Sequence, residues 1–287
     1  MNAQDRFANP KLDLVFKKIF GDVNNSDLLT SFLCAILKIS PDSIKHIEII
    51  DNEIIPDVLN KKFSRLDLLL QVENEYINIE IQVDNYGNYK ERTLYYWSKV
   101  YSEQLGKGED YNTLKDTIAI NIIDFNLFDF KKSHSSFGIY ESEEHIKLTN
   151  KLRIDFLELK KAKQYKADAQ LQEWLDFLNV SNEEELDMLE KTTTNPNIMN
   201  KAITVVRQMS ADEKFLRDIQ RRKETIINER SALNYAKIEG INEGKETGKK
   251  EKTIELIRNM LENNLDMNTI CAITKLSETE INNLLNK

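Results

Sequence analysis

Asp67, Glu80 and Gln82 are the residues whose types and spacing best fit chemistry in this chain. Asp67 begins a short apolar run, and Glu80 and Gln82 alternate with isoleucines in the run INIEIQV, residues 77–83. Side chains two apart on a strand share a face. We therefore expect Glu80 and Gln82 to point the same way, while the isoleucines and Val83 point into a core. A turn at Asn74-Glu75 would bring Asp67 beside Glu80 on the neighbouring strand.

Two carboxylates that meet at the edge of a sheet offer the hard oxygen ligands that Mg²⁺ prefers. Such an ion lowers the pKa of a bound water and stabilises an in-line phosphoryl transition state. The same residues would also suit the solvated face of an ordinary strand, because surface carboxylates are common. The spacing alone leaves both interpretations open.

Residues 11–160 resemble the Rpn family of recombination-promoting nucleases, also labelled transposases, within the PD-(D/E)XK nuclease superfamily. The most telling stretches are SRLD at 64–67 and IEIQ at 79–82. The other matching stretches, in chain order, are 11–21, 92–96, 101–105, 108–111, 120–125 and 157–160. The resemblance implies a restriction-endonuclease-like α/β fold: a mixed sheet flanked by helices, followed by an all-α C-terminal region. It also implies a DNA endonuclease that hydrolyses phosphodiester bonds with Mg²⁺ or Mn²⁺, with a link to recombination or mobile elements.

The resemblance assigns catalytic positions to Asp67, Glu80 and Gln82. Asp67 and Glu80 take the metal-ligand places, and the backbone carbonyl of Ile81 is a further candidate ligand. Gln82 stands where the superfamily usually has a lysine, whose charge would steady the attacking hydroxide or the phosphate. A neutral amide can only orient water. Rpn-like sequences commonly have Gln here, so the departure puts in question which residue supplies the positive charge.

Flanking helices offer supporting candidates. Lys17 and Lys99 could supply the charge, and Arg92 could hold a carboxylate or a phosphate through its planar fork. Asp13 lies on the first predicted helix, where an acidic residue can join the metal site in the wider superfamily. The alternative for each is a solvated surface side chain or an ordinary helix ion pair.

The composition gives mixed signals about DNA binding. The 287 residues carry a formal net charge of −8, whereas nucleic-acid binders often have a basic surface. Basic residues nevertheless surround the motif in sequence: Lys11, Lys17, Lys18, Lys61, Lys62, Arg65, Lys90, Arg92 and Lys99. They predict either a local basic rim for phosphates or a mixed-charge surface.

The sequence also predicts a cytoplasmic protein. No apolar run reaches about 18 residues, so no membrane span is expected. The N-terminus lacks the features of a secretory signal. Cys34 and Cys271 have the apolar settings of buried thiols. His46, His134 and His145 are too scattered for a zinc site.

Periodicity predicts helices over 11–20, 26–38 and 89–105, and strands over 44–55, 66–72, 76–83, 117–125 and 152–159. From about residue 166 the pattern is helical almost to the end. We expect a nuclease domain over 1–165, a helical extension over 166–235 and a small helical module over 236–287.

Small residues recur every four positions in the C-terminal region: Ala232, Ala236, Gly240, Gly244 and Gly248. They indicate either a flexible linker or a seam, meaning a stripe of small residues along which the C-terminal helices of two copies pack closely in a homo-oligomer. Ser277 and Glu280 form a capping box before the final helix. Its acidic start favours protein interaction over reading DNA.

A different class of function stays open. The chain could be a catalytically inactive nuclease-fold protein that binds or regulates through self-association. The missing strand lysine, the acidic net charge and the small-residue seam motivate this alternative.

Overall fold

A computed structural model describes residues 6–50, 67–85 and 87–285. The chain divides into two compact units, Met1–Ile219 and Gln220–Lys287. Lys61, Lys62 and Arg65, three members of the predicted basic rim, lie outside the described residues, as does the part of the predicted first strand beyond Ile50.

The first unit is built on one mixed sheet with strand order β1-β2-β3-β4-β6-β5. The strands are β1 Ile47–Ile50, β2 Leu68–Val72, β3 Glu75–Gln82, β4 Asp116–Ile123, β5 His134–Phe137 and β6 Leu152–Glu158. β3, β4 and β6 are parallel, and the pairs β1–β2, β2–β3 and β5–β6 are antiparallel. Helix α3 (Tyr89–Ser102) is the crossover that the parallel pair β3–β4 requires.

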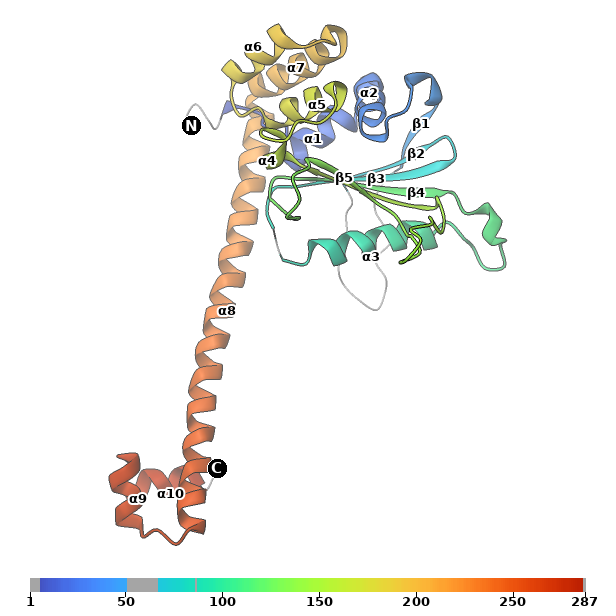
Figure 1. The fold of residues 1–287 in the computed structure, drawn as a ribbon. Helices are drawn as coiled ribbons and strands as arrows, with labels where there is room; N and C mark the ends of the chain where they lie inside the picture. The colour runs from blue at the N-terminus through green and yellow to red at the C-terminus, as the bar shows by residue number, and fades with distance from the viewer. Residues whose placement is uncertain (1–5, 51–66, 86, 286–287) are drawn as a thin grey trace. The chain divides into compact units, whose positions relative to one another are not determined.

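Helices cover both faces of this sheet, with α1, α2 and α5 on one face and α3 on the other (Figure 1). The first face packs Ile77 and Ile79 of β3 into a core with the Phe16, Phe20, Phe32 and Trp174 rings. On the second face a smaller core gathers Ile123 and Phe156 against α3. The restriction-endonuclease-like α/β expectation is therefore confirmed.

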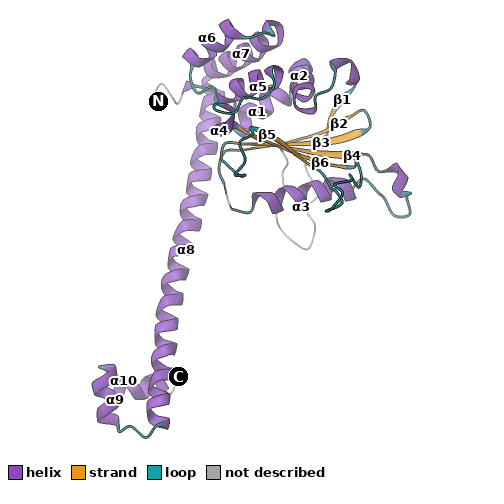
Figure 2. Cartoon of the chain, viewed as in Figure 1, coloured by secondary structure: helices purple, strands orange, loops and turns teal. Residues whose placement is uncertain are grey.

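The remaining helices of the first unit follow from apolar stripes at helical spacing. Their bounds are α1 Asp13–Phe20, α2 Ser26–Leu37, α4 Leu159–Ala162, α5 Ala169–Asn179, α6 Glu183–Thr192 and α7 Pro196–Ala211. α7 begins at Pro196, which tolerates the first helical turn because its missing N–H would have no partner there. After β6 the described chain contains only helices and loops, as expected (Figure 2).

Two local expectations need correction. Val83 does not point into the core: β3 ends at Gln82, and Val83 is 41% exposed. The turn before β3 consists of Glu73 and Asn74, one residue earlier than expected, because Glu75 already pairs with Val72. The turn still makes β2 and β3 neighbouring antiparallel strands.

The second unit comprises the C-terminal part of α8 (Glu213–Glu262) with α9 (Met267–Thr274) and α10 (Glu278–Leu285). Ile257, Ile270 and Ile281 form its small core. The predicted capping box is confirmed, since the Ser277 N–H donates to Glu280 Oε2 over 2.8 Å and the Glu280 N–H donates to Ser277 Oγ over 3.3 Å.

Gly240, Gly244 and Gly248 lie inside the helix α8. A Cβ atom built on any of the three meets nothing within 4 Å, so no contact of the described chain requires glycine there. Gly lowers helix stability by up to about 1 kcal/mol relative to Ala.

We expect the double substitution Gly240→Ala with Gly244→Ala to stabilise α8 by roughly 1–2 kcal/mol, because alanine loses less backbone entropy. Thermal unfolding followed by circular dichroism measures this gain. If the glycines form a seam between two copies, the added methyl groups will also weaken self-association in sedimentation experiments. Unchanged self-association would contradict the seam.

Candidate active site

Glu80 lies on the sheet face that α3 covers, where Arg92 of α3 contacts it. The antiparallel register pairs Leu68 with Ile79, and Asp67 directly precedes Leu68, the first residue of β2. The Asp67 carboxylate accepts a hydrogen bond from the Ile81 N–H, with 2.9 Å between N and Oδ2. Its other oxygen lies 3.0 Å from Lys17 Nζ. The sequence prediction that these two acids bind one cation stays a prediction; the Asp67 charge is near enough to raise the pKa of Glu80.

Glu80 is buried rather than solvated, with a relative exposure of 5%. Its Oε2 atom lies 3.6 Å from Nη2 of Arg92, a residue in the first turn of α3. Its Oε1 atom is buried and has no hydrogen-bond partner among the described residues. Burying a carboxylate oxygen without a hydrogen-bond partner destabilises the folded protein unless a ligand binds that oxygen.

Burial is the main cause that raises the pKa of Glu80, to about 7. The Asp67 carboxylate adds to this rise, while Arg92, a hydrogen bond from Asn78 and Lys17 oppose it. Desolvation thus outweighs the neighbouring cations. In the protein without a bound cation, Glu80 therefore changes from its protonated to its ionised form near neutral pH.

Arg92 of α3 contacts both Glu80 and Gln82. Its Nη1 donates to Gln82 Oε1 over 3.5 Å, and its guanidinium lies 5.2 Å from the centre of the Tyr96 ring. Burial opposes the charged form, but Glu80 and the tyrosines Tyr96 and Tyr89 outweigh it and raise the pKa of Arg92. A helix arginine thus lies against Gln82, the position at which the superfamily usually has its lysine.

The other candidates are distributed around this pair. Lys17 reaches Asp67 from α1, and Asp13 is the first residue of the same helix. Lys99 pairs with Glu103 at 3.8 Å, on its own helix. Most of the described basic residues near the motif in sequence are matched by acids, such as Lys11 by Asp124 at 3.0 Å.

Sequence reasoning missed Asn78 and Tyr89. Asn78 precedes Glu80 by two residues on β3 and so shares its face, a signal that the alternation already contained. Tyr89 is the first residue of α3. Both are buried, and in the part of the chain that the structure describes Asn78 Oδ1 and Tyr89 Oη have no hydrogen-bond partner.

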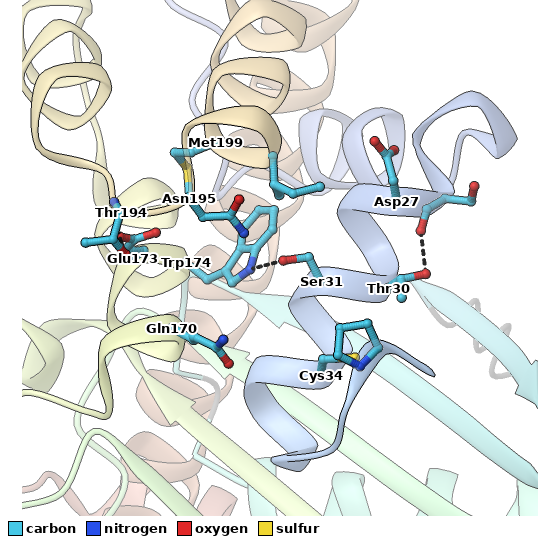
Figure 3. A pocket seen from close by; sticks show the side chains of 13 residues that line it. Asp27, Thr30, Ser31, Cys34, Gln170, Glu173, Trp174, Thr194, Asn195 and Met199 are labelled. Atoms are coloured by element: carbon cyan, nitrogen blue, oxygen red, sulfur yellow. Dashed lines mark hydrogen bonds between the residues drawn. The ribbon is translucent and has the colours of Figure 1, made fainter. Parts of the chain in front are cut away.

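Other buried or hollow features of the first unit are separate from this site. A cavity of about 640 Å³ lies among α2, α5 and the start of α7, and the Trp174 indole points across it to Ser31 Oγ at 3.3 Å (Figure 3). The buried Glu158 carboxylate accepts from Lys161 Nζ over 2.7 Å and from the Leu127 N–H, so it holds the loop after β4. These groups satisfy one another and read as structural.

The comparison with known families decides the identity. The model of a family described as "PD-(D/E)XK nuclease family transposase" matches residues 10–236. The chain belongs to this family. No curated protein and no solved structure matches the chain. Membership confirms the expected superfamily and indicates a nuclease, and the sheet, the acid pair and α3 of this PD-(D/E)XK chain all lie within the matched residues.

The hard oxygens of the site fit a divalent cation, which nucleases of this superfamily generally use. Glu80 Oε1 and Asn78 Oδ1 are buried acceptors without donors, and Asp67 adds a second carboxylate. Within the described residues no group of three or more His, Cys, Asp or Glu is arranged to hold a metal. A cation here would therefore rely on two carboxylates together with neutral oxygens.

Proposed function

We propose that this chain is a DNA endonuclease that hydrolyses phosphodiester bonds with Mg²⁺ or Mn²⁺. The observation that carries the proposal is the buried carboxylate of Glu80 near Asp67. No group of the described chain donates a hydrogen bond to Glu80 Oε1. The two acids lie toward the carboxyl end of β3, and β4 continues in parallel beside it. Ligands of open α/β sheets bind outside the carboxyl ends of such strands.

Asp67 and Glu80 would hold the cation, with the Ile81 carbonyl as a further ligand. The bound ion would lower the pKa of a water molecule and offset charge on the phosphate. The Ile81 N–H holds one Asp67 oxygen in place, and Lys17 balances the charge of the other. This arrangement orients the Asp67 carboxylate before any ligand arrives.

Arg92 and Gln82 would act on the substrate side. Arg92 is half-buried, and its contacts with Glu80 and Gln82 orient its guanidinium. A guanidinium so placed can stabilise negative charge that develops on a phosphate. Gln82, as a neutral amide, would orient water or a phosphate oxygen. Asp13 remains a candidate for the edge of the site.

DNA is the proposed substrate, and self-association through the C-terminal helices is the proposed assembly. None of the described helices is long and apolar enough to cross a membrane. We propose a cytoplasmic location, where the two free cysteines would stay reduced.

The direct test is cleavage of supercoiled and linear DNA by the purified full chain. We expect cleavage with Mg²⁺ or Mn²⁺ and none with EDTA, and calorimetry should detect Mn²⁺ binding. An Asp67→Asn preparation made in parallel distinguishes the protein's own activity from a contaminant. Asp42→Asn, an exposed acid of the first unit, is the matched control and should cleave normally.

Two results would contradict the proposal. One is cleavage that persists equally in EDTA or in Asp67→Asn. The other is a wild-type protein that binds no Mn²⁺ and leaves DNA intact while it self-associates firmly in sedimentation. The second result would favour the inactive nuclease-fold protein that acts as a binding or regulatory partner.

A further inference from the structure

Within the described residues, Glu80 Oε1 and three polar atoms of nearby residues have no hydrogen-bond partner. In the part of the chain that the structure describes, six buried side-chain nitrogen or oxygen atoms have no hydrogen-bond partner. Four of the six are Asn78 Oδ1, Glu80 Oε1, Tyr89 Oη and Arg92 Nε. Native proteins satisfy nearly all such atoms, so a concentration of them at one place needs an explanation.

The four atoms belong to one neighbourhood. Asn78 and Glu80 share a face of β3, and the Asn78 amide hydrogen-bonds Glu80. Arg92 contacts the Glu80 carboxylate from α3. The Tyr89 hydroxyl is close enough to Glu80 and Arg92 for both charges to influence it. The two strand residues and the two helix residues therefore enclose a single polar region.

Their chemistry divides into two halves. Asn78 Oδ1 and Glu80 Oε1 are acceptors to which no group of the described chain donates a hydrogen bond. Arg92 Nε is a donor that lacks an acceptor, and burial, followed by the nearby Glu80 charge, keeps the Tyr89 hydroxyl protonated by raising the pKa of Tyr89 well above its usual value. A cation would satisfy the first half, and an oxyanion would satisfy the second.

We propose that these atoms form one subsite for a cation-bound phosphate, in which Asn78 and Tyr89 have specific roles. Asn78 Oδ1 supplies a neutral oxygen ligand to the divalent cation beside Glu80. The Tyr89 hydroxyl, together with Arg92 Nε, donates hydrogen bonds to an oxygen of the phosphate that the cation carries. This inference rests on the proposed function and extends it to two residues.

Tyr89→Phe tests the phosphate half with the smallest change. The hydroxyl has no partner in the described chain, so its removal should leave the fold and Mn²⁺ affinity within about twofold of wild type. Inorganic phosphate titrated calorimetrically into the Mn²⁺-loaded protein should bind about tenfold more weakly, as expected for the loss of a hydrogen bond to a charged group. Tyr95→Phe, an exposed tyrosine on the same helix, is the matched control and should bind phosphate normally.

Asn78→Ala tests the cation half. We expect the Kd for Mn²⁺, measured by calorimetry on the full chain, to rise about tenfold or more, within the range for lost support of a metal site. Asn78→Asp retains an oxygen at the same place and should restore affinity to within about threefold of wild type. Circular dichroism of each variant excludes misfolding as the cause.

The outcomes separate this inference from the proposed function. If Asn78→Ala binds Mn²⁺ like wild type while Asp67→Asn does not, the role of Asn78 is overturned and the nuclease proposal stands. If Tyr89→Phe binds phosphate as tightly as Tyr95→Phe, the role of Tyr89 is overturned. If wild type itself binds no Mn²⁺, the proposed function fails first.

Discussion

Glu80→Gln is expected to lower Mg²⁺-dependent cleavage by about a thousandfold or more while stabilising the cation-free protein at pH 8. The cleavage is lost because a neutral amide is a far poorer cation ligand than a carboxylate. The stability rises because a buried carboxylate with an unpaired oxygen is replaced by a group of the same shape without charge.

The pH dependence follows from the raised pKa of Glu80. The folded protein binds the proton up to about pH 7, whereas the unfolded chain releases it near 4.5. Protonation therefore favours the folded state, so this contribution is fully present below pH 4.5 and is lost as the pH rises through 7. A difference of about 2.5 pKa units corresponds to roughly 3 kcal/mol. The advantage of Gln over Glu should be small at pH 5 and reach its full size above pH 7.

Urea unfolding of both proteins at pH 5 and pH 8, without divalent cations, measures this effect. Glu239→Gln, an exposed glutamate of α8, should change neither stability nor cleavage. Added Mn²⁺ should stabilise wild type at pH 8 but not Glu80→Gln. Equal stability of wild type and Glu80→Gln at pH 8 would show that the buried carboxylate carries no such cost.

Arg92→Ala is expected to reduce cleavage by roughly a hundredfold to a thousandfold, the usual cost of losing one preorganised transition-state contact. Arg92→Lys should recover only part of this loss. An ammonium is a point charge, whereas the guanidinium fork contacts both Glu80 and Gln82.

The pH–rate profile distinguishes a role of Arg92 in the site from a merely structural one. Arg92 lowers the pKa of Glu80, so its removal should raise that pKa further and move the acidic limb of the profile to higher pH. Arg258→Ala, an exposed arginine of the second unit, removes the same charge elsewhere and should leave the profile in place. An unshifted acidic limb in Arg92→Ala would remove Arg92 from the site.

The local sequence predicted the parts of this protein that depend on short-range periodicity. The alternation through residues 77–83 indicated β3 and the shared face of Glu80 and Gln82, and the apolar spacing along 89–105 indicated α3. The Ser277–Glu280 capping box was equally readable. These features follow from neighbours two to four residues apart, which the sequence displays directly.

Tertiary structure decided the environment of the acid pair. A helix that begins nine residues after Glu80 folds back over it, and the resulting burial rules out a solvated strand face for Glu80, which the spacing alone had left open. Lys17 reaches Asp67 across 50 residues of sequence, and Arg92 reaches Gln82 from the crossover helix. In the described chain the same packing leaves Asn78 Oδ1 and Tyr89 Oη without a hydrogen-bond partner. No sequence periodicity contains these facts, because desolvation and charge pairing depend on which elements meet in space.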